Sequence, residues 1–149
     1  MSANILEVAA RSEWKSGLKT HSQIRSFDPV VMDEPKELGG DNQGPNPLEY
    51  LVASLNGCKG VMIPLIAKEL KFEFSELSFD TKGSVDLRGL MGDPSVSTHF
   101  QNLRFQVTIK TDEPEERLQA LQSAVADRCP VYNLLRDAGV SLQTQWVRG

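Results

Sequence analysis

The sequence predicts an α+β fold built as one domain over residues 1–149. Alternating apolar residues before residue 28, and again over 103–109, indicate strands. A long apolar segment over 47–70 lies between them and has helical spacing. Because 149 residues suffice for one hydrophobic core, we expect N-terminal antiparallel strands, a long central helix, further strands, two C-terminal helices and a final strand.

The N-terminal strands are predicted to form a hairpin. "ILEVAARSEW" (5–14) and "LKTHSQIRSF" (18–27) both alternate, and "KSG" interrupts the pattern between them. A short apolar run, "VVM" (30–32), indicates a third strand. The Gly-, Asn- and Pro-rich segment "LGGDNQGPNP" (38–47) then predicts a loop that leads into the long helix.

The long helix is predicted to begin with Asn46 as its N-cap and Pro47 at its first position. Its centre contains "NGCKG", which resembles a turn by composition alone. The apolar spacing passes through this stretch without a slip, however, so we expect it to be helical. The predicted apolar stripe is spaced four, three, four and three, and consists of Leu51, Leu55, Cys58, Met62 and Leu65.

Gly57 and Gly60 flank the cysteine of this stretch and weaken the helix. Each interior glycine costs about 1 kcal/mol relative to alanine, so we expect them to serve close helix packing or to leave space beside a thiol. Pro64 predicts a bend shortly afterwards. Cys58 is therefore either a packing residue or a thiol at the bottom of a pocket.

The second half of the chain alternates between strands and helices. "RGLMGDPSVST" (88–98) predicts a loop, in which Leu90 and Met91 would suit an apolar pocket wall. Around it the sequence predicts a bulged strand over 72–79, a strand over 103–109, a helix over 114–128 capped by Asp112, a short helix over 130–138 and a strand over 140–146.

Composition excludes several classes of function. The net charge is -4 and Lys and Arg are scattered, which argues against nucleic acid as a partner. The N-terminus lacks the pattern of a secretory signal, and no stretch looks long and apolar enough to cross a bilayer, so we expect a cytoplasmic protein. His21 and His99 lie far from either cysteine, and no phosphate-binding loop is present. We therefore expect neither metal nor cofactor.

Cys58 and Cys129 are the candidate reactive residues. Two cysteines in a reducing compartment do not form a stabilising disulfide framework. Cys129 precedes Pro130 at a predicted helix N-terminus, whose free N–H groups favour a thiolate. Cys58 lies about three turns inside its helix and gains little from the dipole, so local physics favours Cys129 as nucleophile. Buried packing remains the alternative for both, since free cysteines are often buried.

The motifs "EPKELGG" (34–40), "GPNPLEYLVASLNGC" (44–58) and a second "CP" (129–130) together resemble the OsmC/Ohr family of osmotically inducible and organic hydroperoxide resistance proteins. The resemblance implies an intertwined α+β homodimer with its cysteine-bearing helices at the centre. It implies a thiol peroxidase in which Cys58 attacks a hydroperoxide and Cys129 resolves the resulting sulfenic acid as a disulfide. A dithiol, of the lipoyl type in this family, would then reduce that disulfide.

The sequence departs from the pattern of the hydroperoxide-resistance branch at the charged residues, an arginine and a carboxylate, that accompany the reactive cysteine there. Where that branch has an arginine in the first hairpin, this chain has "WKSGLKTH" (14–21), and Lys15, Lys19 or Arg25 would replace it, with Lys19 preferred. Directly after "NP" that branch has a glutamate, whereas this chain has Leu48 at that position and a carboxylate one residue later, at Glu49. Glu49 lies about 180° from Cys58 around the helix.

Glu49 would therefore cap the helix or reach a basic group of another subunit. The missing arginine leaves a second hypothesis open, a catalytically inactive OsmC-like dimer that binds a small apolar ligand. A third is a structural role with both cysteines in the core.

Overall fold

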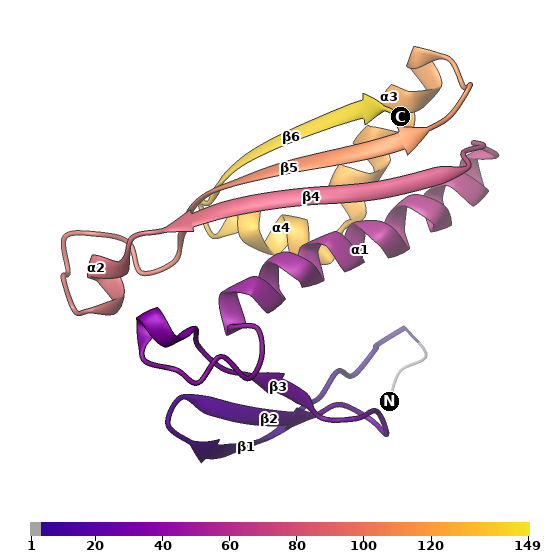
Figure 1. Cartoon of the computed structure of the whole chain (residues 1–149). Coiled ribbons are helices and arrows are strands. Elements are labelled where there is room, and N and C mark those ends of the chain that lie inside the picture. The colour runs from indigo at the N-terminus through magenta and orange to yellow at the C-terminus, as the bar shows by residue number, and fades with distance from the viewer. Residues whose placement is uncertain (1–3) are drawn as a thin grey trace. The chain divides into compact units, whose positions relative to one another are not determined.

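The computed structural model describes residues 4–149, and the predicted α+β element order is confirmed (Figure 1). The chain divides into two compact units, one ending at Leu51 and one beginning at Val52, which are described separately. The elements are β1 (Arg11–Ser16), β2 (Lys19–Gln23), β3 (Val30–Met32), the 3₁₀ helix η1 (Lys36–Leu38), α1 (Pro47–Leu70), β4 (Glu76–Val85), α2 (Leu87–Leu90), β5 (Phe100–Lys110), α3 (Glu115–Arg128), α4 (Pro130–Asp137) and β6 (Ser141–Arg148).

The first unit contains an antiparallel sheet in the order β1-β2-β3. The predicted hairpin is present, with Glu13 opposite His21 and a turn at Gly17, whose φ of 53° suits glycine. The first strand begins at Arg11 rather than residue 5, however. The apolar side chains of Ile5 and Leu6 are exposed in this structure, so their alternation does not correspond to a strand with a buried face.

The start of α1 is fixed within the first unit by reciprocal hydrogen bonds. The backbone N–H of Glu49 donates to Asn46 Oδ1 at 2.8 Å, and the backbone N–H of Asn46 donates to Glu49 Oε2 at 2.8 Å. This is a capping box, and it confirms Asn46 as the predicted cap. The hydroxyl of Tyr50 also donates to the carbonyl of Val31 at 2.9 Å, which ties the first helical turn to β3.

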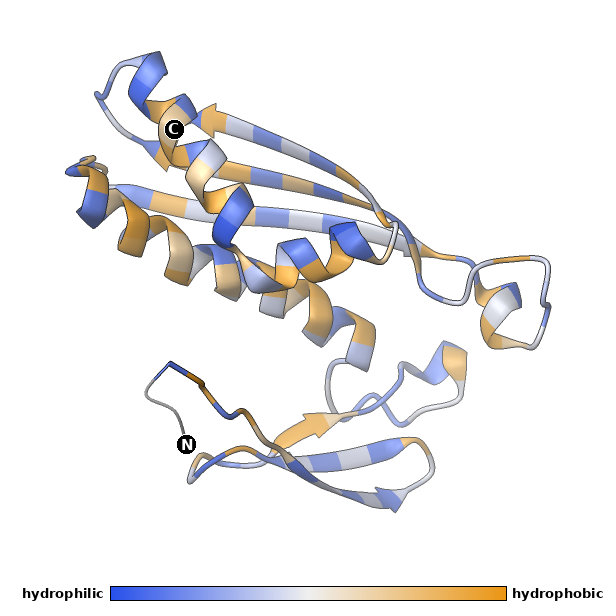
Figure 2. Cartoon of the chain, turned by 180° about the vertical axis from the view of Figure 1, so that it is seen from behind, coloured by the Kyte–Doolittle hydropathy of each residue, from blue (hydrophilic) through white to orange (hydrophobic). Residues whose placement is uncertain are grey.

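The second unit is a sheet in the order β4-β5-β6 with helices over one face (Figure 1). β4 and β5 are antiparallel, whereas β5 and β6 are parallel and joined through α3 and α4. Apolar and polar residues alternate along β5 (Figure 2), because only one of its faces lies against the helices. The buried face of β5 consists of Phe100, Leu103, Phe105, Val107 and Ile109.

Two predictions for the second half were wrong in detail. The strand expected over 72–79 runs instead from Glu76 to Val85, because Phe72 belongs to the end of α1 and donates its N–H to the Ala67 carbonyl at 2.8 Å. Lys71, at a φ of 52°, makes the left-handed turn that this helix end requires. The cap of α3 is Pro114 rather than Asp112.

The buried side of α1 is rotated from the predicted apolar stripe. Leu55 is buried as expected, but Cys58 and Met62 are only half-buried and Leu65 is exposed. The sheet packs against the adjacent side of the helix, and this rotation turns Lys59 into the core. The buried residues of α1 are Leu55, Lys59, Ile63, Ile66 and Ala67.

The two glycines of "NGCKG" have different surroundings. A Cβ atom on Gly60 would lie 3.6 Å from the ring of Phe79, an ordinary van der Waals contact, so this glycine faces β4. A Cβ atom on Gly57 would meet nothing within 4 Å. Position 60 therefore has room for a methyl group but for little more, and open space lies beside Gly57.

The expectation that no segment could span a bilayer needs correction for α1. Its 24 residues are long and apolar enough by length and composition alone. The core helix of a globular domain passes the same test, and α1 places Leu55, Ile63 and Ile66 in the core of the second unit. One such helix is weak evidence for a membrane span.

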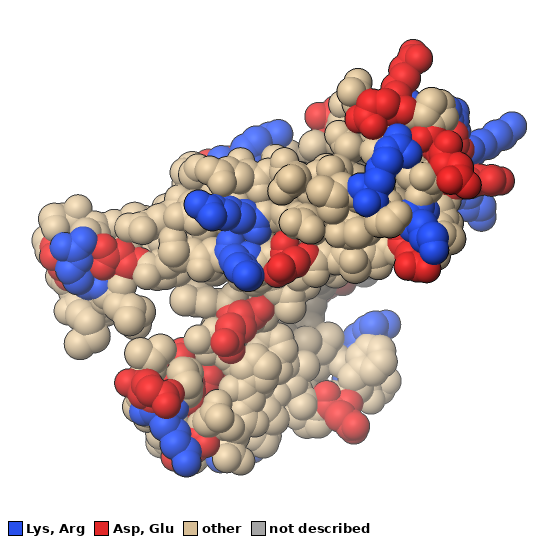
Figure 3. Space-filling model, turned by 45° about the horizontal axis from the view of Figure 1, so that its top comes forward, with Lys and Arg blue, Asp and Glu red and all other residues tan. Residues whose placement is uncertain are grey.

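Charged side chains are mixed over the face drawn in Figure 3, where Lys and Arg lie among Asp and Glu. Several form short surface ion pairs, such as Arg88 with Asp86 at 2.6 Å. The loop between β4 and β5 contributes exposed apolar residues instead. Leu90 and Met91 are 73% and 84% exposed, so neither packs within its own unit, and their role as a pocket wall stays a prediction.

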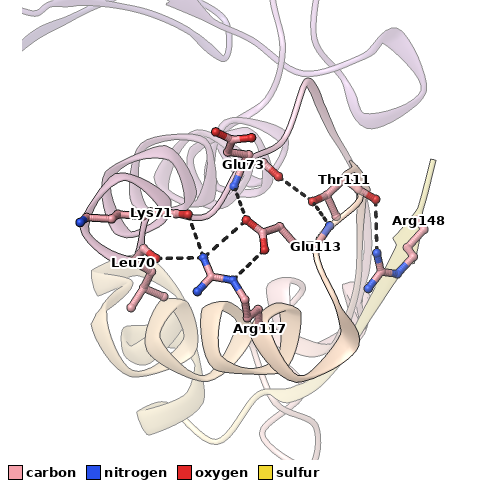
Figure 4. A network of polar contacts seen from close by, with 7 residues as sticks. All are labelled: Leu70, Lys71, Glu73, Thr111, Glu113, Arg117 and Arg148. Carbon is pink, nitrogen blue, oxygen red and sulfur yellow. Dashed lines mark hydrogen bonds and ion pairs between the residues drawn. The ribbon is translucent and has the colours of Figure 1, made fainter.

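A polar network fixes the C-terminal end of α1 to the segment between β5 and α3 (Figure 4). Arg117 donates to the carbonyls of Leu70 and Lys71 at 3.0 and 2.8 Å, and its Nε lies 2.7 Å from Glu113 Oε2. Glu113 in turn accepts the backbone N–H of Glu73 at 3.0 Å. These bonds satisfy carbonyls that a helix end otherwise leaves open, and they hold the end of α1 in register with the sheet.

Replacing Arg117 with alanine is therefore expected to destabilise the protein, because the carbonyls of Leu70 and Lys71 lose their donor. We expect the melting temperature to fall by roughly 3–6 °C, measured by circular dichroism. Arg136→Ala is the matched control, since within residues 4–149 the only ion pair of Arg136 is with its exposed neighbour Asp137. Equal shifts in the two variants would contradict this role for Arg117.

Candidate active site

The structure brings together the two cysteines that the sequence singles out, although 71 positions separate them. Cys58 lies on α1 and Cys129 lies between α3 and α4. Their sulfur atoms are 3.0 Å apart, with the Cys129 thiol as donor and the Cys58 sulfur as acceptor. Both cysteines are free. The pair lies in the second unit.

Cys129 is held by the junction of α3 and α4. It is the N-cap of α4, with Pro130 at the first helical position, as the sequence predicts. The side-chain amide of Asn133 donates to the carbonyl of Cys129 at 2.8 Å and to that of Ala126 at 3.0 Å. This clamp fixes the turn in which the thiol lies.

An ion pair ties the same junction to α1. Both guanidinium Nη atoms of Arg128 bind the carboxylate of Glu69, at 2.6 and 3.0 Å. A two-bond contact of this kind orients its partners more strictly than a single bond. Because Arg128 directly precedes Cys129, the contact holds the cysteine-bearing turn against the cysteine-bearing helix.

The two thiols differ in burial. Cys129 is 0% exposed, whereas Cys58 is half-buried, so a molecule from solvent meets Cys58 first. Burial raises the pKa of Cys129, and its hydrogen bond to Cys58 acts in the same direction. The backbone N–H of Tyr132 and the ammonium of Lys59 oppose this shift without cancelling it. The helix dipole predicted a thiolate at Cys129, whereas the pKa of this thiol is raised, because desolvation outweighs the helix N-terminus.

Lys59 supplies a cation beside the thiols. Its side chain is only 2% exposed, and its Nζ lies 4.0 Å from the ring centre of Tyr132 and 5.5 Å from that of Phe105. Aromatic faces at these distances stabilise a desolvated ammonium. Burial lowers the pKa of Lys59, and negative charge on Cys129 and Cys58 opposes that shift. The thiols and this ammonium are thus electrostatically coupled.

Sequence reasoning missed Lys59 because it looked for the cation in the N-terminal hairpin. Lys15, Lys19 and Arg25 all belong to the first unit. Lys15 pairs with Glu13 at 2.6 Å, and a role for Lys19 at the thiols stays a prediction. A signal for Lys59 was present, since it follows Cys58 directly and lies four residues after Leu55.

Glu49 has a defined structural role, the capping box with Asn46. Its proposed reach to a basic group of another subunit stays a prediction. No group of three or more His, Cys, Asp or Glu side chains within residues 4–149 is arranged to hold a metal ion.

Comparison with known families decides the relationship. The sequence profile described as OsmC-like protein matches residues 40–145. The chain belongs to the OsmC-like family. The resemblance to OsmC/Ohr proteins seen in the sequence motifs is thereby confirmed. No curated protein matches the sequence.

Solved OsmC-like structures share the fold at low sequence identity. The OsmC-like protein from Mycoplasma pneumoniae is 16% identical, with a TM-score of 0.79 over 95% of this chain and 98% of that chain. An organic hydroperoxide resistance protein from Elizabethkingia anophelis, with thiocyanate bound, is 18% identical, with a TM-score of 0.76 over 99% of both chains. An OsmC-like protein of unknown function from Vibrio cholerae is 12% identical, with a TM-score of 0.77 over 96% and 100%.

The buried charge of Lys59 generates a prediction about this OsmC-like protein's stability. Because burial lowers the pKa of Lys59, the unfolded chain binds this proton more tightly, and the cost of burying the ammonium disappears as pH rises toward 10.5. We expect Lys59→Met to be more stable than the wild type at pH 7, by about 1–3 kcal/mol.

The stability gap between Lys59→Met and the wild type should then narrow as pH rises toward 10.5. Negative charge on the two sulfurs acts in the same direction, since it stabilises the wild-type ammonium. Urea unfolding under reducing conditions at several pH values measures the gap. A gap that widens with pH would contradict the assignment of Lys59 as a desolvated cation.

Proposed function

We propose that this protein is a thiol-dependent hydroperoxide reductase in which Cys58 is the peroxidatic and Cys129 the resolving cysteine. The observation that carries the proposal is the 3.0 Å separation of the two sulfurs beside the buried Lys59 ammonium. Family membership supports the chemistry. The names of two solved relatives, from Legionella pneumophila and Elizabethkingia anophelis, include organic hydroperoxide resistance.

In the first step, the Cys58 thiolate attacks the terminal oxygen of the hydroperoxide. The O–O bond breaks, the alcohol leaves after taking up a proton, and Cys58 becomes a sulfenic acid, two electrons more oxidised. The hydrogen bond from Cys129 and the ammonium of Lys59 both favour negative charge on the Cys58 sulfur. Lys59 therefore takes the electrostatic role expected of the missing arginine.

In the second step, the Cys129 sulfur attacks the sulfenic sulfur of Cys58. An S–S bond forms and the S–O bond of the sulfenic acid breaks, and the hydroxyl takes up the proton of the Cys129 thiol and leaves as water. The short distance between the sulfurs favours this closure over further oxidation of Cys58. A dithiol, of the lipoyl type, returns the two electrons and restores both thiols. This cycle requires the reducing conditions of the cytoplasm, the proposed location.

The active form is proposed to be an intertwined homodimer. Its support is the side of α1 that the second unit leaves uncovered, where Val61 is 65% exposed and Leu65 is also exposed. A helix that is apolar on two sides needs a second partner for its outer side. Two copies packed through this face would place the cysteine-bearing helices at the centre.

The central prediction concerns the two cysteines. Cys58→Ser should lower the consumption of cumene hydroperoxide in the presence of dithiothreitol at least about 100-fold, because the attacking sulfur is lost. In Cys129→Ser, a single turnover should leave a sulfenic acid on Cys58, trapped by dimedone and located by peptide mass spectrometry. In the wild-type protein, the Cys58 and Cys129 peptides should instead be joined by a disulfide, with a mass two hydrogens below the sum of the reduced peptides.

Lys59→Met separates this proposal from an inactive, ligand-binding dimer. With the cation removed, peroxide consumption should fall about 10–100-fold, and Lys59→Arg should recover part of it. Cys58→Ser activity equal to the wild type would exclude the peroxidase cycle. An inactive binding protein would in addition show no disulfide between the Cys58 and Cys129 peptides after peroxide treatment.

The dimer is tested by charging the outer side of α1. Val61→Glu should shift the protein from dimer to monomer in size-exclusion chromatography with light scattering, because a carboxylate would be buried unpaired at the interface. Gln101→Glu is the matched control, as Gln101 is an exposed residue of β5. A wild-type protein that is monomeric at micromolar concentration would contradict the proposed assembly.

A further inference from the structure

A cavity of about 240 Å³ opens beside Lys59, on the side where α3, α4 and β6 meet. Neither Cys58 nor Cys129 is among its lining residues, so it is distinct from the space around the thiols. All of its walls belong to the second unit. The side chains that define its chemistry are Lys59, Gln122, Ser123, Tyr132, Thr144 and Trp146.

The lining has one charged residue, the lysine. Ser123 and Thr144 are exposed and mark the mouth, whereas Lys59 is almost fully buried and marks the inner end. No lining residue is a carboxylate. Positive charge in a desolvated position attracts an anion far more strongly than the same charge at the surface.

The remaining walls suit an organic anion with a small apolar body. Tyr132 and Trp146 present aromatic rings, and the hydroxyls of Ser123 and Thr144 and the amide of Gln122 offer hydrogen bonds near the mouth. The volume lies slightly below the usual range for ligand pockets, about 300–1,000 Å³. It therefore suits a compact molecule, such as a single ring that carries one carboxylate, and excludes a long acyl chain.

We infer that this cavity binds a small monocarboxylate, with its carboxylate toward the Lys59 ammonium and its apolar body between Tyr132 and Trp146. The inference does not depend on peroxide chemistry, because the cavity and the buried ammonium are present whether or not Cys58 reacts. A carboxylate in this cavity would approach the Lys59 ammonium from the side of α3 and β6. The thiols interact with the same ammonium but do not line the cavity.

Trp146 reports on the cavity directly. The chain has two tryptophans, and Trp14 is exposed in the first unit, so Trp14→Phe leaves Trp146 as the only indole. Titrating this protein with cyclohexanecarboxylate at pH 7 should give a saturable change in fluorescence. The neutral cyclohexanecarboxamide has the same shape and should bind at least tenfold more weakly.

Two further substitutions in the Trp14→Phe protein complete the test. Lys59→Met should weaken carboxylate binding at least tenfold by removing the charge, with circular dichroism checking the fold. Ala126→Leu should do the same by filling the cavity while leaving Lys59 in place, since Ala126 also lines it. Equal binding of carboxylate and carboxamide, or unchanged affinity in Ala126→Leu, would overturn the inference even if the peroxidase cycle holds.

Discussion

The structure around the thiols depends on burying one ammonium group. Lys59 lies almost fully inside the second unit, and its charge is held by aromatic faces and by two sulfur atoms rather than by a carboxylate. An isolated charge in such a place is costly. The cost is offset only while Tyr132, Phe105 and the thiol pair remain in position. Stability and the proposed reactivity of the thiols therefore depend on the same contacts.

Those contacts require α1 to lie close to the sheet at a defined rotation. Gly60 faces the ring of Phe79, which stacks with that of Phe105 at a centroid distance of 5.9 Å. A side chain longer than that of alanine at position 60 would meet the ring of Phe79 and push the helix away from the sheet. At the far end of the helix, Arg117 and Glu113 hold the closing turn. Gly60 and the polar network thus determine the position of α1 against the sheet at two points along the helix.

The sequence predicted the order of elements well, because long periodic segments such as α1 and β5 carry strong signals. The prediction failed where one pattern of apolar residues is compatible with two kinds of local structure. Phe72 and Phe74 alternate as a strand would, yet the first closes α1 and the second lies in a connection before β4. Within the site, both cysteines were found, because their order and the "CP" motif are local features. The raised pKa of Cys129 was not predicted, since the burial of this thiol is a tertiary property.

The cation was missed for a related physical reason. Helical spacing admits two neighbouring stripes on α1, one through Cys58 and one through Lys59, and hydropathy favours the stripe without the charge. Only the sheet decides which side is buried, and it selects the charged one. A lysine inside an apolar helix is usually taken as the solvent side. Here it marks the inner side, so a charge that violates the apolar pattern is itself the signal of a site. The most informative residue of "NGCKG" is therefore the lysine that follows the cysteine.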